Sequence, residues 1–185
     1  MSLGLYLHIP YCFSKCRYCD FYSAPGQRGV PRAYVDALLR ELSRFAPDAP
    51  LRPDTLYFGG GTPSLLDPAD AARLIAAAQP LPGAEITLEA NPETVTEDSL
   101  RAFREAGVNR ISFGVQSARD SQLQTLGRPH TAKQARAAFA AARRAGFENL
   151  SGDIMLALPH YTQAEFDETL ELIEDGGAAT FPPTS

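Results

Sequence analysis

One short stretch constrains this chain more than any other: residues 11–21, with the sequence YCFSKCRYCDF. It contains Cys12, Cys16 and Cys19, and the chain has 3 cysteines in total. An odd number of cysteines cannot all pair with one another as disulfides. Their tight C-x3-C-x2-C spacing is instead typical of metal or redox chemistry. We therefore expect a metal-binding loop near the N-terminus.

Composition limits the class of protein. The chain has 185 residues, of which 44% are hydrophobic and 21% charged, so we expect one domain over 1–185 that folds around a real core, with an atypical tail over 176–185. The formal net charge of -5 argues against nucleic acid as a partner. No apolar run approaches the roughly 20 residues of a membrane span, and the N-terminus lacks the features of a signal peptide. These features predict a cytoplasmic protein that binds small molecules and proteins.

The sequence alternates between strand-like and helical segments. The predicted strands are 4–9, 54–60, 84–90, 109–115 and 149–158. The predicted helices lie near 31–46, from 68 onward, from Thr96 to Gly107, from Thr131 to Gly146, and from Thr162 to about 175. This alternation predicts parallel strands joined by right-handed crossovers, in either an open doubly wound sheet or a barrel. A sixth strand is due at about Ala178, but Pro182 and Pro183 would end it almost at once.

In both architectures, functional residues lie at the carboxyl ends of the strands. The unusual residues of this chain fall there. The cysteines follow the first predicted strand, GGGTP (59–63) ends the second, and Glu89 ends the third. Gln116 follows the fourth, and Asp153 lies in the fifth. We expect these residues to meet at one edge of the sheet.

The spacing of the cysteines bears on the kind of metal. A structural zinc site needs four ligands, and His8, His130 and His160 are badly placed to supply the fourth. A four-iron cluster held by three thiolates keeps one iron open to a small molecule. The cluster is the favoured interpretation, with zinc and incidental cysteines as the alternatives.

The motifs together resemble a known family. C-x3-C-x2-C after a first strand, with Tyr18 before its last cysteine and GGGTP after the second strand, resembles the radical S-adenosylmethionine (radical SAM) superfamily. The segments LYLHIPYC, CDFYS, YFGGGTPSLL, EANPET, SFGVQS, LGRPHT and GDIMLALP narrow this resemblance. They are similar to the oxygen-independent coproporphyrinogen III oxidase-like branch and, within it, to the HemW-type heme chaperones. The resemblance covers residues 4–175 and implies a partial (β/α)6 TIM-like barrel with about five β/α units and an incomplete sixth.

The resemblance also implies cofactors and the residues that bind them. A [4Fe–4S] cluster would be held by Cys12, Cys16 and Cys19, and its open iron would bind the amine and carboxylate of S-adenosylmethionine. An electron from the cluster would then cleave the sulfonium to a 5'-deoxyadenosyl radical. The residues implied in cofactor binding are Tyr6 near the methionine part, Glu89, Gly60, and a second region made of Tyr18, Gly61, Thr62, Gln116, Arg128 and Asp153.

Two functions remain open on the resemblance. One is a HemW-type chaperone that hands heme to acceptor proteins, and the other is an oxygen-independent coproporphyrinogen III oxidase. Oxidases of this branch carry a further cysteine two residues after the motif, where this chain has Phe21, and this favours the chaperone. Implied partners are S-adenosylmethionine, heme or a porphyrinogen, heme-accepting proteins, and an electron donor such as flavodoxin or ferredoxin. Family members continue into a C-terminal domain that is absent here, so an inactive fragment is the third expectation.

Overall fold

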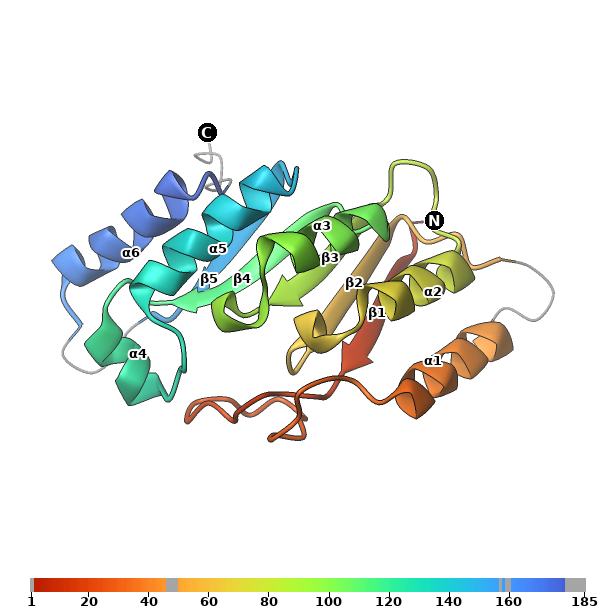
Figure 1. The fold of residues 1–185 in the computed structure, drawn as a ribbon, viewed down its shortest axis with the longest axis horizontal. Helices are drawn as coiled ribbons and strands as arrows, with labels where there is room; N and C mark the ends of the chain where they lie inside the picture. The colour runs from red at the N-terminus through yellow and green to blue at the C-terminus, as the bar shows by residue number, and fades with distance from the viewer. Residues whose placement is uncertain (1, 46–49, 157, 159–160, 179–185) are drawn as a thin grey trace.

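The computed structural model describes residues 2–45, 50–156, 158 and 161–178. Its strands form one parallel sheet in the order β1-β2-β3-β4-β5, which is the order of the sequence (Figure 1). The strands are β1 (Gly4–Ile9), β2 (Thr55–Gly60), β3 (Glu85–Ala90), β4 (Arg110–Gln116) and β5 (Asn149–Ile154). The prediction of parallel, alternating β/α units is confirmed.

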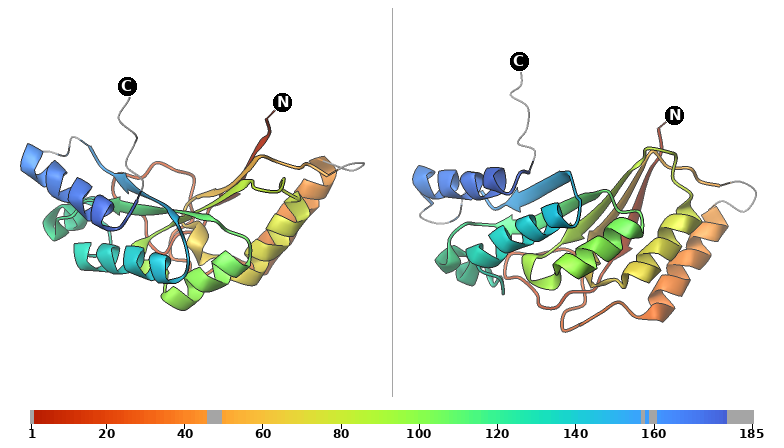
Figure 2. Two further views of the ribbon diagram at one scale, coloured as in Figure 1. Left: turned by 90° about the horizontal axis from the view of Figure 1, so that it is seen from above. Right: turned by 45° about the horizontal axis from the view of Figure 1, so that its top comes forward.

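The helices that follow the strands cover one face of this sheet. They are α1 (Arg32–Phe45), α2 (Pro68–Ala78), α3 (Glu97–Glu105), α4 (Asp120–Leu126), α5 (Ala132–Arg144) and α6 (Gln163–Asp175), with two 3-10 turns, η1 (Pro63–Leu65) and η2 (Pro92–Thr94). Sequential strands joined by crossovers of one hand place their helices on one side. Accordingly α1 packs on α2, α2 on α3 and α3 on α5, outside a curved sheet (Figure 2). This arrangement matches the expected partial barrel and excludes a doubly wound sheet.

Local sequence signals fix most helix ends. Thr96, Thr131 and Thr162 each accept a hydrogen bond from the backbone three residues on and complete a capping box. Gly127, in the segment LGRPHT, ends α4 in the left-handed region at φ +72°. Among the described residues, none of these helices has the length and apolar character needed to cross a membrane.

The fifth strand is shorter than predicted. The sequence pattern predicted a strand over 149–158, but β5 ends at Ile154. The physical cause lies in the neighbouring strand: β4 has a register shift between Gly114 and Gln116, and Gln116 has a φ of +67°. The β4 backbone turns away from β5 at this point. The Met155 amide donates a last hydrogen bond to the Gln116 carbonyl, and the pairing of β4 with β5 ends there. The sixth strand was predicted at about Ala178, which is not in a strand, and residues 179–185 lie outside the described residues.

The two faces of the sheet differ in polarity because side chains alternate along each strand. The helix-covered face is buried and apolar: Leu7, Ile9, Leu56, Phe58, Ile86, Leu88, Ala90, Ile111, Phe113, Val115 and Leu150. The concave face is polar or aromatic: Tyr6, His8, Tyr57, Thr87, Glu89, Arg110, Ser112, Ser151 and Asp153. The core therefore lies between the sheet and the helices, and the polar side chains of the concave face are available to bind a ligand.

The buried face predicts a large effect of truncation at Leu88. This side chain is 0% exposed, so Leu88→Ala should lower the free energy of unfolding by about 2 to 5 kcal/mol. Leu3 is 40% exposed, and Leu3→Ala should change the free energy of unfolding by less than about 0.5 kcal/mol. Urea denaturation followed by circular dichroism measures both. Equal losses at the two positions would contradict the assignment of the core to this face.

Candidate functional site

The loop after β1 crosses the carboxyl end of the sheet and is held at both sides (Figure 1). Near β1, the Cys12 amide donates to the Ala24 carbonyl at 3.0 Å, and the Gln27 amide donates to the Cys12 carbonyl at 3.0 Å. On the far side, the Arg17 amide donates to the Leu126 carbonyl at the end of α4, also at 3.0 Å. These bonds fix the cysteine loop across the mouth of the sheet.

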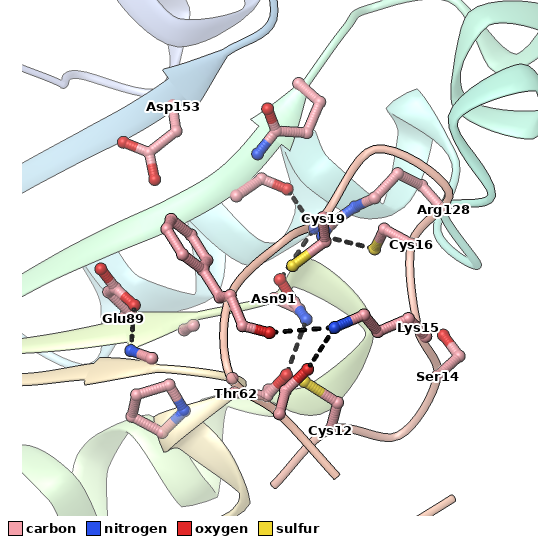
Figure 3. A pocket seen from close by; sticks show the side chains of 18 of the residues that line it. Cys12, Ser14, Lys15, Cys16, Cys19, Thr62, Glu89, Asn91, Arg128 and Asp153 are labelled. Atoms are coloured by element: carbon pink, nitrogen blue, oxygen red, sulfur yellow. Dashed lines mark hydrogen bonds between the residues drawn. The ribbon is translucent and has the colours of Figure 1, made fainter. Parts of the chain in front are cut away.

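All three cysteines are free and line one pocket of about 310 Å³ (Figure 3). Among the described residues, no three Cys, His, Asp or Glu side chains converge closely enough to hold a single metal ion. In a four-iron cluster each thiolate binds a different iron, so the ligands surround the cluster rather than meeting at one point. The donor set therefore fits a [4Fe–4S] cluster better than a mononuclear zinc ion.

The pocket gathers most of the residues that the sequence singled out. Its lining includes Cys12, Cys16, Cys19, Tyr18, Gly60, Gly61, Thr62, Glu89, Gln116, Arg128 and Asp153. Tyr6 is outside this lining: it is 53% exposed, stacks on Tyr57 and lies with its hydroxyl 3.2 Å from His8 Nδ1. The His8 Nε2 atom is 3.0 Å from the Tyr22 carbonyl oxygen, so this imidazole is engaged away from the thiols.

The glycine turn after β2 allows close approach to the cysteine loop. A Cβ atom added at Gly61 would lie 2.8 Å from Cys12 Sγ and 2.8 Å from the Tyr11 carbonyl oxygen. Gly60 has a φ of +118°, a conformation that residues with a side chain rarely adopt. The turn therefore requires glycine at both positions, and its lack of side chains leaves the backbone open to the pocket.

Glu89 faces this pocket from the carboxyl end of β3. Tyr57 donates to Glu89 Oε1 at 2.9 Å, and the Gly60 amide donates to Oε2 at 3.1 Å. Burial raises the pKa of Glu89; the two hydrogen bonds oppose this rise, and the charge of Asp153 adds to it. Glu89 is thus a desolvated carboxylate, fixed in position, that can accept a hydrogen bond from a ligand.

The opposite wall is built around Arg128, which lies just after α4. Its Nη1 atom donates to Cys16 Sγ at 3.5 Å, and its Nη2 atom donates to Asn91 Oδ1 at 2.8 Å. Asn91 in turn donates to Thr62 Oγ1 at 3.2 Å. Asn91 was missed in the sequence, although its place directly after β3, in the segment EANPET, was a usable signal.

A second unpredicted feature is a buried pair behind Arg128. The His130 side chain is fully buried, with Nε2 at 3.1 Å from the Val115 carbonyl oxygen and Nδ1 at 3.3 Å from Glu93 Oε2. A carbonyl can only accept, so Nε2 must donate. The pair anchors the segment after α4 to both β4 and η2. No sequence pattern indicated it, because the two residues are far apart in the chain.

Charge is distributed unevenly around the pocket (Figure 3). Glu89 and Asp153 lie on one side, while Arg128 and Lys15 lie on the side of the thiols. Burial raises the pKa of Asp153, and burial raises the pKa of Tyr18 to about 12, so the phenol keeps its proton. A ligand that carries both a positive group and a carboxylate would match these two sides.

Comparisons with known proteins identify relatives of this chain. The HemW heme chaperone of Haemophilus influenzae is 38% identical over 183 residues, covering 93% of this chain and 48% of that protein. The HemW heme chaperone of Escherichia coli is 43% identical over 169 residues, covering 88% and 45% respectively. The chain thus spans about half the length of these relatives.

A solved structure supports the same fold. Coproporphyrinogen III oxidase (HemN) from Escherichia coli, described as a radical SAM enzyme, superposes with a TM-score of 0.81 at 32% identity, covering 92% of this chain and 41% of that one. Residues 6–173 match the radical SAM superfamily, and so include the cysteine loop and all five strands except for the first two residues of β1. The chain belongs to the radical SAM superfamily.

Proposed function

We propose that this chain binds a [4Fe–4S] cluster through Cys12, Cys16 and Cys19 and S-adenosylmethionine beside it, as part of a HemW-type heme chaperone. The observation that carries the proposal is the pocket itself. Three free thiols share one cavity with a desolvated carboxylate, a side-chain-free glycine turn and a buried arginine. Membership of the superfamily implies the cluster and S-adenosylmethionine in general, and the pocket offers groups that fit both.

Each side of the pocket has a proposed role. When bound, the cluster supplies the electron for reductive cleavage of S-adenosylmethionine. Glu89 accepts hydrogen bonds from the cofactor, and Gly60 lets its backbone come close. Thr62, Gln116, Arg128 and Asp153 belong, with Tyr18 and Gly61, to the proposed second cofactor region. Tyr6 keeps its proposed contact with the methionine part only if the ligand extends beyond the pocket lining.

The choice between chaperone and oxidase rests on the position after the cysteine motif. Phe21 stands where oxidases of this branch carry a further cysteine, and its ring is 68% exposed beside the pocket. An exposed aromatic ring offers a contact for a flat apolar ligand such as heme. Heme, heme-accepting proteins, an electron donor such as flavodoxin or ferredoxin, and a cytoplasmic location form part of this proposal.

Heme binding and decarboxylation separate the two functions. The reconstituted chain should bind heme, observed as a change in the heme absorption spectrum, and should release no carbon dioxide from coproporphyrinogen III. The same preparations should be tested with S-adenosylmethionine and a reductant present. Carbon dioxide release without heme binding would favour the oxidase. Loss of both activities from a fully loaded protein would favour an inactive fragment.

The cluster assignment is tested by replacing the thiols. After anaerobic reconstitution, Cys12→Ser, Cys16→Ser or Cys19→Ser should abolish or cripple the cluster, because a thiolate ligand of the iron is removed. Ser14→Ala, in the same loop, is the matched control and should load normally. Iron and sulfide analysis with absorption spectra measures loading. A single-cysteine variant with normal iron, sulfide and spectrum would refute the assignment.

Cofactor binding is tested separately at Glu89. Glu89→Gln should keep its iron but bind S-adenosylmethionine about 10- to 150-fold more weakly, because a hydrogen bond to a charged group contributes roughly 1.5 to 3 kcal/mol. Glu85→Gln, at the amino end of the same strand, is the control. The cluster's electron paramagnetic resonance signal follows the titration. Equal affinities for wild type and Glu89→Gln would exclude this contact.

The affinity for S-adenosylmethionine should change with pH in one direction only. Because burial raises the pKa of Glu89, its carboxylate is protonated at higher pH than an ordinary glutamate. Affinity of the wild type should therefore be full at alkaline pH and fall as the pH decreases through this raised pKa. Glu89→Gln should lack that decrease, so the two titration series should converge at low pH.

A further inference from the structure

Arg128 is buried without a carboxylate partner. The residue is 9% exposed, and among the described residues it forms no ion pair with an Asp or Glu side chain. Its hydrogen bonds go to Asn91 Oδ1, to the Gly114 carbonyl oxygen and to Cys16 Sγ, and its Nε atom has no partner in the part of the chain that the structure describes. The charge of Glu93 acts on Arg128 without a direct ion pair, and a buried charge that lacks a direct ion pair is costly. The guanidinium is thus placed for an anion in the pocket.

The Cys16 sulfur lies within hydrogen-bond distance of Arg128. Once it binds iron, this sulfur is a thiolate, and Arg128 Nη1 is 3.5 Å from it. One-electron reduction makes an iron–sulfur cluster more negative by one charge. A fixed positive charge and a hydrogen bond to a ligand sulfur both favour the reduced form, because they stabilise added negative charge.

The backbone holds Arg128 in this position. Its amide donates to the Leu123 carbonyl at 2.8 Å, just after the left-handed Gly127. The adjacent bond from the Arg17 amide to the Leu126 carbonyl brings the same segment against the cysteine loop. Two residues further on, the buried His130 binds β4 and faces Glu93. The contact with Cys16 is therefore fixed from both sides of Arg128.

Gly114 reserves the space that the guanidinium occupies. A Cβ atom at this position would lie 2.9 Å from Arg128 Nη2 and 3.0 Å from Asn91 Oδ1. Gly114 is not among the residues with positive φ, so alanine is compatible with its backbone. Gly114→Ala should therefore displace Arg128 from its partners while leaving the positive charge in the protein.

We propose that Arg128 raises the reduction potential of the cluster through its hydrogen bond to the Cys16 thiolate, independently of any contact with S-adenosylmethionine. The inference rests on the proposed cluster. Reduction transfers one electron from an added reductant to the oxidised [4Fe–4S]²⁺ cluster, giving [4Fe–4S]⁺, with no bond or proton exchanged. Arg128 acts on this equilibrium through the ligand sulfur, and is therefore a positioning residue rather than a catalytic one.

The experiment is a potentiometric titration of the reconstituted chain without S-adenosylmethionine, followed by electron paramagnetic resonance. Arg128→Gln should make the cluster harder to reduce by about tenfold in equilibrium constant, which is about 59 mV for a one-electron couple. Gly114→Ala should lower the potential in the same direction, and Arg128→Lys should fall between wild type and Arg128→Gln. Arg17→Gln removes an exposed charge from the same loop and should leave the potential nearly unchanged.

The outcomes separate this inference from the proposed function. If the wild type fails to take up iron and sulfide, the proposed cluster is wrong and the inference falls with it. If Arg128→Gln loads fully and keeps the wild-type potential, the inference is overturned while the cluster stands. An equal shift in Arg17→Gln would also overturn it, because a general charge effect would then suffice. If Arg128→Gln, Arg128→Lys and Gly114→Ala all fail to take up the cluster, Arg128 is required for assembly of the site rather than for its reduction potential. That result also overturns the inference.

Discussion

The hydrogen bond from the Arg17 amide to the Leu126 carbonyl joins two segments that are more than a hundred residues apart. The bonds of Cys12 hold the cysteine loop beside β1, and this bond helps to hold its far side against the end of α4. With it, the loop crosses the mouth of the sheet, and Cys16 comes to lie against Arg128. Bringing together two segments so far apart in the chain costs conformational entropy. That cost is already incurred when β1 to β5 pair in sequence order to form the sheet. The site therefore depends on the completed sheet.

The alternation of side chains along the strands gives the two faces of the sheet different roles: one forms the core and the other lines the pocket. Leu88 enters the core, while the next residue, Glu89, enters the pocket. The same relation holds in β4, where Phe113 packs edge-on against Phe139 and Gly114 leaves room for a guanidinium. A shift of one residue in the register of either strand would exchange core and site together. Stability of the fold and geometry of the pocket are thus set by the same pairing.

Sequence reasoning succeeded where the signal was local. Short strand-like runs predicted the strands, and threonine caps predicted the helix starts at Thr131 and Thr162. Loop chemistry at strand ends predicted a shared pocket, and Glu89 lies in it. The end of β5 was placed wrongly because it depends on the left-handed Gln116 in another strand.

The features that sequence could not supply are contacts between distant segments. Asn91 holds Arg128, and Glu93 faces His130, but neither pair has a spacing rule that would reveal it. Tyr6 illustrates the reverse case. Its position in the motif resemblance is clear, yet its ring stacks on Tyr57 outside the pocket lining.

The buried His130 carries a consequence for the dynamics of the site. Its Nε2 atom donates to the Val115 carbonyl, and its Nδ1 atom lies 3.3 Å from Glu93 Oε2; neither of these two atoms has another partner within the described ranges. The Nε2 proton is buried against the Val115 carbonyl, so water reaches it only when the segment after α4 lifts from β4 and η2. The rate at which this His130 proton exchanges with solvent deuterium would therefore measure how often Arg128 leaves the pocket.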